Sequence, residues 1–181
     1  ALLDERVPPT AALDREEALA SLAHRFFSSR GPATVQDFAK WSGMTATDAK
    51  NGLEAVKERL YSETADGKTH WFAPSTKRTA KQRAPTAHLL SIYDEYVSGY
   101  KDRSAIVSAR NGARLMAMGN ALTSIVVVNG QITGTWKRRV EKGTAVITIE
   151  LFDRLTKAEH QPLEAAVQAY GDFLGMPAAQ E

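Results

Sequence analysis

An α+β fold is predicted for this chain of 181 residues by the order of its periodic segments. Three segments with apolar residues at helical spacing come first, and a segment typical of a β-hairpin, turned at Asp66-Gly67, follows them. Alternating apolar residues then fill most of 125–152, and a last helical segment begins at Thr156. This order predicts a helical module followed by an antiparallel, β-rich C-terminal half with a closing helix.

Each helix of the first module begins at a residue that caps helices well. Asp14, Thr34 and Thr45 can each accept a hydrogen bond from an unpaired amide of the first turn. A carboxylate follows each of them three positions later, where it favours the positive end of the helix. We therefore expect helices over 14–29, 34–41 and 45–59.

The second and third helices are joined by a tight turn at Ser42-Gly43, and a hairpin over 60–72 comes next. Two amphipathic helices joined by a short turn form a helix-turn-helix, and a hairpin after them supplies a wing. Residues 13–74 are therefore predicted to form a winged helix-turn-helix domain.

The helix from Thr45 takes the place of a recognition helix. Lys50 and Asn51 would face base edges in a major groove, and Lys68 in the wing could contact phosphate. Glu54 and Glu58 follow on the same surface, and a phosphate backbone would repel them. A solvated face or a protein contact is therefore an equally supported interpretation of this helix.

Composition excludes several classes of function. The chain has no cysteine, which rules out disulfides, thiol catalysis and cysteine-ligated zinc. Its apolar runs are too short for a membrane span, and no signal peptide is visible, so we expect a cytoplasmic protein with no membrane contact. Histidines and acids lack metal-ligand spacing, and no nucleophile-base-acid set is visible, so we predict no cofactor or metal and rank a stand-alone hydrolase last.

Positive charge is concentrated in the middle of the chain. Residues 77–142 carry 12 basic and 4 acidic side chains, whereas the formal net charge of the whole chain is only +2. Residues 75–86 form a basic linker, which is either a mobile connection or a strap along a nucleic-acid backbone. The basic side chains in and after this linker are Lys77, Arg78, Lys81, Arg83, Lys101, Arg103, Arg110 and Arg114. Residues 1–12 resemble an interdomain connector, and we expect the chain to be a fragment of a longer protein.

Residues 87–181 are predicted to form a C-terminal α+β domain. Strands over 125–128 and 131–138 flank Asn129-Gly130, and a third strand over 145–152 follows Lys142-Gly143. An amphipathic helix then runs from Thr156 toward Gly175, with Pro162 as a possible kink near its start. This half is antiparallel and β-rich, and it could itself be winged-helix-like.

A group of cations ends the middle strand of this half. Lys137, Arg138 and Arg139 follow Trp136, and together they could form a phosphate-binding edge with an aromatic platform. The alternative is a strand edge kept soluble by its charges, with the tryptophan in the core.

The segment from His88 to Ser104 could line a DNA cleft through Tyr96, Tyr100 and Arg103, because aromatic rings and cations stack on unpaired bases. Asp94 is better explained by a structural role, for example pairing with Arg103, than by catalysis.

Several short motifs occur in order along the chain: Leu89-Leu90, Asp94-Glu95-Tyr96, Gly99-Tyr100, Asp102-Arg103, Val128-Asn129-Gly130 and Gly134-Thr135-Trp136. Together with the preceding helix-turn-helix and wing, they resemble the AlkZ-like family of winged-helix DNA glycosylases. The resemblance covers the chain from about Leu13 to Gly175.

This resemblance implies tandem winged helices around a β-rich part and removal of alkylated or crosslinked bases without a metal or organic cofactor. The catalytic pair of the family, Gln-x-Gln or Gln-x-Asp, lies in an N-terminal part upstream of the aligned region. Five glutamines of this chain lack a Gln or Asp two positions later: Gln36, Gln82, Gln131, Gln161 and Gln168. No catalytic residue is therefore carried over from the family to this chain.

The first hypothesis is therefore the DNA-binding portion of a glycosylase-like protein, with no catalytic residues of its own. Its partners would be non-specific or lesion-containing DNA and the missing N-terminal part of the same protein. A scaffold or protein-interaction module and a sequence-specific, regulator-like DNA binder are the alternatives.

Overall fold

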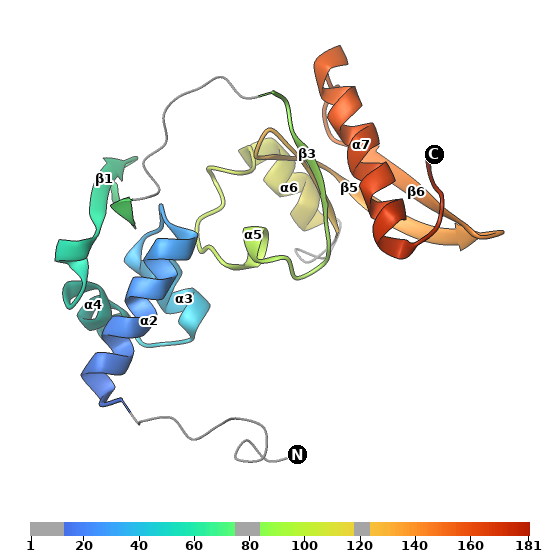
Figure 1. Ribbon diagram of the computed structural model, residues 1–181. Coiled ribbons are helices and arrows are strands. Elements are labelled where there is room, and N and C mark those ends of the chain that lie inside the picture. Colours follow the sequence, from blue (N-terminus) through green and yellow to red (C-terminus); the bar gives the residue numbers. More distant parts are fainter. Residues whose placement is uncertain (1–12, 75–83, 118–123) are drawn as a thin grey trace, which may run out of the picture. The chain divides into compact units, whose positions relative to one another are not determined.

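The computed structural model describes residues 13–74, 84–117 and 124–181 (Figure 1). Within these ranges it contains six α-helices, a short 3-10 helix and two β-sheets. The chain divides into two compact units, Ala1–Thr79 and Ala80–Glu181. Both units contain helices and strands, which confirms the α+β class.

The first unit begins with three helices and continues into a two-stranded sheet. Its elements are α2 (Arg15–Arg30), α3 (Val35–Ser42), α4 (Ala46–Glu54), a 3-10 turn η1 (Lys57–Arg59), β1 (Tyr61–Ala65) and β2 (Lys68–Phe72). The strands β1 and β2 are antiparallel, with Tyr61 paired with Phe72. In addition, Ala33 and Trp71 exchange two backbone hydrogen bonds of 3.1 and 2.8 Å, which tie β2 to the segment between α2 and α3.

The third helix is shorter than predicted. We expected it to reach Arg59, but α4 ends at Glu54 and the chain tightens into η1. The amide of Ala55 still donates to the carbonyl of Asn51, four positions back, at 3.1 Å, whereas the amide of Val56 donates to the carbonyl of Leu53, three positions back, at 3.0 Å. Bonds of the shorter spacing end the α-helix here, because they wind the backbone more tightly than α-helical bonds.

The core of the first unit is aromatic. Phe26 and Phe27 of α2 and Phe38 of α3 are almost fully buried, and their ring centroids lie 5.1 to 5.6 Å apart. Leu53 of α4 and Phe72 of β2 are also buried. Rings packed at such spacings stabilise a small unit beyond the area that they bury.

The second unit is built on a five-stranded sheet in the order β3-β4-β5-β6-β7. Neighbouring strands are antiparallel except β6 and β7, which are parallel. Three helices complete the unit: α5 (Glu95–Ser98), α6 (Ala109–Ala117) and α7 (Lys157–Leu174). The strands are β3 (Ala87–Leu90), β4 (Ile125–Val128), β5 (Gln131–Glu141), β6 (Thr144–Leu151) and β7 (Ala178–Gln180).

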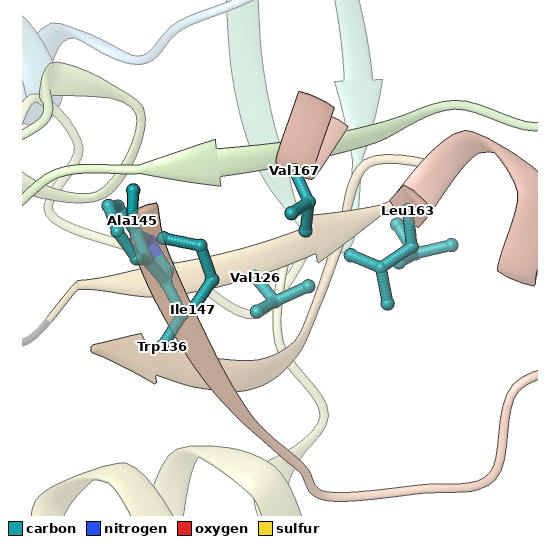
Figure 2. Close-up of a cluster of buried hydrophobic side chains, with 7 residues drawn as sticks. Val126, Trp136, Ala145, Ile147, Leu163 and Val167 are labelled. Carbon is teal, nitrogen blue, oxygen red and sulfur yellow. The ribbon is translucent and has the colours of Figure 1, made fainter. Parts of the chain in front are cut away.

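The two faces of this sheet have separate cores because side chains alternate along each strand. Val126 and Val128 of β4 pack with Leu163 and Val167 of α7 on one face, as Figure 2 shows in part. Residues alternating with them, such as Ile125, face a second cluster that includes side chains from α5, α6 and the loop between them. The closing helix therefore covers one face of the sheet only.

Three hairpins turn on the same local geometry. Asp66-Gly67, Asn129-Gly130 and Lys142-Gly143 each have positive φ at both residues, with φ of 51 and 72°, 51 and 78°, and 49 and 79°. Two positive φ angles define the type I′ turn, whose twist matches that of the flanking strands. The turns predicted from the sequence at these dipeptides are confirmed.

Helix α7 runs through Pro162 without a break, as one helix of 18 residues. No helix in the described part of the chain is long and apolar enough to cross a membrane.

Candidate nucleic-acid interface

Lys50 and Asn51 are both exposed on α4, whereas Ala49 and Leu53 face the core of the first unit. The helix is fixed to α2 by Arg15, whose guanidinium lies 2.7 Å from the carboxylate of Asp48. This ion pair partly neutralises an acid at the start of α4, the helix that presents the two predicted contact residues.

Glu54 at the end of α4 and Glu58 on η1, the two acids expected to repel a phosphate backbone, differ in their surroundings. Glu54 forms an ion pair with Lys57, and the hydrogen bond between them raises the pKa of the Lys57 ammonium. Glu58 is exposed on η1. The repulsion that a phosphate backbone would meet at Glu54 is therefore reduced, whereas that at Glu58 is not.

The hairpin of β1 and β2 is exposed along most of its length, with Lys68 on its second strand. Glu63 lies opposite His70 across the two strands, and His70 Nδ1 is 3.2 Å from the carbonyl of Lys68. At the end of β2, Trp71 is half-buried and Phe72 is buried.

The predicted cations of the linker, Lys77, Arg78, Lys81 and Arg83, lie outside the described residues. Their contact with DNA stays a prediction from the sequence.

The segment before β4 contributes Tyr100, Lys101 and Arg103. Tyr100 and Arg103 are half-buried and Lys101 is exposed. Asp94 has the structural role predicted for it, but it caps α5 by accepting a 2.9 Å hydrogen bond from the amide of Tyr96. The partner that we suggested for Asp94, Arg103, is thus replaced by a backbone amide.

Two further cations of the basic middle region hold the second unit together. Arg110 lies 3.7 Å from the carboxylate of Asp153, and Arg114 donates to the carbonyl of Phe152 at 2.7 Å. The guanidinium of Arg114 also lies over the Phe152 ring. Part of the positive charge read from the sequence is therefore used within the fold.

The cations at the end of β5 point to opposite faces of the sheet because they are consecutive in a strand. Lys137 and Arg139 lie on the face away from α7, and both are exposed. Arg138 lies on the α7 face, where it donates a 2.8 Å hydrogen bond to the hydroxyl of Tyr170. The hairpin of β5 and β6 extends beyond the end of α7, which leaves its tip accessible (Figure 1).

Arg139 differs from its neighbours because it is paired with two carboxylates. Its Nε donates to Glu141 at 2.6 Å, and its Nη1 donates to Glu181. These hydrogen bonds, first that to Glu181, raise the pKa of Arg139, and the same bond lowers the pKa of Glu181. The predicted phosphate contact of Arg139 is therefore blocked in this structure by acids of the chain itself.

The predicted aromatic platform at Trp136 is corrected by the structure. Only 6% of Trp136 is exposed, its ring packs edge-on against Tyr170, and its indole Nε1 donates to the carbonyl of Leu90 at 2.9 Å. With both ring and nitrogen used inside the core, no face is left for a base to stack on. The alternative of a core tryptophan is the correct one.

Two glutamines considered for catalysis have structural partners. Gln131 donates to the carbonyl of Ala105 at 2.8 Å, and Gln168 donates to the carbonyl of Ala178 at 3.3 Å. Within residues 13–74, 84–117 and 124–181, no group of three or more histidines and acids is placed to hold a metal ion.

Lys142 and Tyr170 were not among the contact residues predicted from the sequence. Lys142 is exposed at the tip of the β5–β6 hairpin, and its place before Gly143 was the signal that could have added it to the cationic group. Tyr170 lies on α7, and its hydroxyl accepts a hydrogen bond from Arg138 at 2.8 Å. No sequence signal links two residues so far apart in the chain.

Comparison with known proteins gives a family and a fold. The family model described as DNA glycosylase AlkZ-like matches residues 1–173. Among solved structures, the chain is similar to the DNA glycosylase AlkZ of Streptomyces sahachiroi, with a TM-score of 0.72 at 16% sequence identity. The similarity covers 95% of this chain and 48% of that one, so the present chain spans about half the length of its structural relative. No curated protein matches the chain.

Proposed function

The chain belongs to the DNA glycosylase AlkZ-like family, and we propose that it is the DNA-binding portion of a glycosylase-like protein. It contacts duplex or damaged DNA mainly through the phosphate backbone. The family match over residues 1–173 is the observation that carries this proposal.

The first unit acts as a winged helix in this proposal. Three helices, the turn between α3 and α4, and the β1–β2 hairpin follow one another in the order that a winged helix-turn-helix requires. The backbone bridge between Ala33 and Trp71 supports it, because it holds the hairpin against the helices. Lys50 and Asn51 would then enter or border a groove, and Lys68 would contact a phosphate from the wing.

The second unit adds backbone contacts through Lys137, Arg138 and Lys142 of the β5–β6 hairpin, together with Tyr100, Lys101 and Arg103. Cations on a strand edge fit a phosphate backbone, and contacts of this kind carry little sequence information. The linker cations at 77, 78, 81 and 83 would add further phosphate contacts.

This chain contributes no catalytic residue in our proposal. The glutamines tested lack the family's motif spacing, and Gln131 and Gln168 bind backbone carbonyls. Release of an alkylated base by this chain alone, measured on DNA that carries such a base, would contradict this part of the proposal and leave the binding role intact.

Binding to DNA tests the main proposal. We expect fluorescence anisotropy with a labelled duplex to show affinity that falls steeply as salt rises, since each neutralised phosphate releases counterions. Changing Lys77, Arg78, Lys81 and Arg83 together to Ala should flatten the slope of log K against log[salt] by up to about 3 to 4. A duplex that carries a lesion, compared with an intact one, shows whether damage adds affinity.

A matched control for that experiment changes Arg110 and Arg114, which the structure pairs with Asp153 and the Phe152 carbonyl. These substitutions should affect stability more than the salt slope. Absent binding, or binding that does not depend on salt and that the linker substitutions leave unchanged, would remove the DNA-binding proposal.

A protein-interaction or scaffold role is the second candidate. Glu58, Glu63 and Asp66 are exposed on the first unit, and residues 1–76 carry 11 acidic against 9 basic side chains. This role predicts little affinity for duplex DNA even at low salt, so the anisotropy experiment separates the two candidates.

A further inference from the structure

Arg139 and Thr148 form a small site on the face of the sheet opposite α7. Arg139 Nη1 and the hydroxyl of Thr148 both donate to the same carboxylate oxygen of Glu181, and the distance from the hydroxyl to that oxygen is 3.3 Å. Arg139 Nη1 also lies 3.2 Å from the Thr148 hydroxyl, so the two donors support each other. Two donors from neighbouring strands thus converge on one anionic oxygen.

The position of Glu181 follows from the pairing of the last strand. Strand β7 runs parallel to β6, with Gln180 opposite Ile147, and the amide of Glu181 donates to the Ile147 carbonyl at 2.9 Å. The next step along both strands places Glu181 beside Thr148 on the same face. The carboxylate is therefore delivered by backbone pairing, and it does not rest on side-chain contacts alone.

The site is accessible and has a cation beside it. The side chains of Arg139 and Glu181 are 44% and 57% exposed. Lys137 is paired with Thr148 across the two strands and points to the same face. A DNA backbone phosphate, like a carboxylate, carries one negative charge shared by two oxygens, and these oxygens accept charge-assisted hydrogen bonds from a guanidinium.

We propose that Arg139 and Thr148 form a binding site for a DNA backbone phosphate, and that Glu181 occupies it in this structure in place of that phosphate. The inference rests on the proposed function for the identity of the anion. Binding of a phosphate to Arg139 Nη1 and Thr148 requires Glu181 to leave, since its carboxylate would otherwise repel the incoming phosphate, whereas Glu141 keeps its hydrogen bond to Arg139 Nε. Glu181 thereby lowers the affinity of the hairpin for DNA.

The test replaces Glu181 by glutamine in the full chain. Glu181→Gln should raise the affinity for a non-specific duplex about two- to five-fold at low salt, a factor typical of an exposed ion pair. The slope of log K against log[salt] should become steeper by about 0.9, because one more phosphate is neutralised. Adding Arg139→Ala to this variant should abolish both gains.

Glu164→Gln is the matched control, because Glu164 is exposed on α7 and loses the same charge away from the site. Equal effects of the two glutamine variants would show a general charge effect and overturn the proposal. A gain from Glu181→Gln that persists after Arg139→Ala would overturn it as well.

Inorganic phosphate separates this proposal from the proposed function. In NMR spectra, the Nη signals of Arg139 and the side-chain signals of Thr148 should shift on phosphate addition in Glu181→Gln and stay in place in the unchanged chain, because these are the groups that Glu181 holds. A phosphate-induced shift in Glu181→Gln, without salt-dependent binding of DNA by either chain, would exclude the DNA-binding function but support the anion site. No shift in the Glu181→Gln variant would end the anion site, whatever the DNA result.

Discussion

Replacing Thr34 by alanine should destabilise the first unit far more than the same change at Thr45. Both threonines begin helices, and each hydroxyl accepts from an amide three positions later, at 3.2 Å for Thr34 and 3.1 Å for Thr45. The difference lies in burial, because Thr34 is 6% exposed and its partner Asp37 only 4%, whereas Thr45 is exposed.

The expected cost follows from the groups that lose their partners. An N-cap contributes roughly 1 kcal/mol, and Thr45→Ala should cost about that much, because water can replace the lost hydroxyl. In Thr34→Ala, the buried amide of Asp37 loses its acceptor, and its carboxylate loses a 2.7 Å hydrogen bond. An unsatisfied buried group costs roughly 1–3 kcal/mol more, which gives about 2–4 kcal/mol for Thr34→Ala.

Amide hydrogen exchange measures the two effects in one experiment. Exchange of the α2 amides should accelerate about 30- to 1,000-fold in Thr34→Ala and about 5-fold in Thr45→Ala, at roughly 1.4 kcal/mol per tenfold change. The β4 amides report on the second unit and serve as an internal reference. Equal acceleration in both variants would refute the argument that burial of the cap sets its contribution.

Three further predictions concern the second unit. Gly134→Ala should disrupt the pairing of β5 with β6, because the added Cβ would lie 2.4 Å from a backbone carbonyl oxygen of β6. In the control Gly143→Ala, the added Cβ meets no atom within 4 Å, so only the cost of a positive φ remains. Thermal melts of both variants followed by circular dichroism check this difference. Hydrogen bonds from the Thr156 amide and hydroxyl lower the pKa of Glu159, so its stabilising effect is complete above the unfolded pKa and is lost as pH falls through the lower, folded value. Denaturation across this acidic range should show a smaller pH dependence for Glu159→Gln. Burial raises the pKa of the Tyr96 hydroxyl, which donates to a carbonyl in the β4–β5 turn at 2.8 Å. Tyr96→Phe should lower the free energy of unfolding by about 1 kcal/mol, measured by urea denaturation. The same variant should lose a late phase of tyrosine ionisation in an alkaline ultraviolet titration.

Features encoded within a few residues could be predicted from the sequence. The Thr34 cap and its Asp37 partner were identified by spacing alone, because a capping box closes within one helical turn. Asn129-Gly130 and the other two turn dipeptides were identified for a similar reason, since positive φ at two successive positions restricts the residues that can occupy them. The exposure of Lys50 and Asn51 likewise followed from helical periodicity.

Features that depend on residues far apart in the chain were either not predicted from the sequence or left with two alternatives. Strand β3 and helix α6 lack a strong local pattern, and their places depend on pairing with β4 and on contacts with residues 152 and 153. The sequence left two roles open for Trp136, and its contacts with Leu90 and Tyr170 decided between them. Their partners lie more than 30 residues away in the chain.

By itself, the sequence determined the starts of α2, α3, α4 and α7, the three hairpin turns, the basic middle region and the resemblance to a DNA glycosylase family. Only the tertiary structure decided which cations remain available to a phosphate and which are held by the chain's own acids. Arg139 shows the physical reason: a charge is read from one residue, but its availability depends on what folding brings beside it. The acid beside it, Glu181, directly follows a strand of three residues whose position is set by backbone pairing with β6.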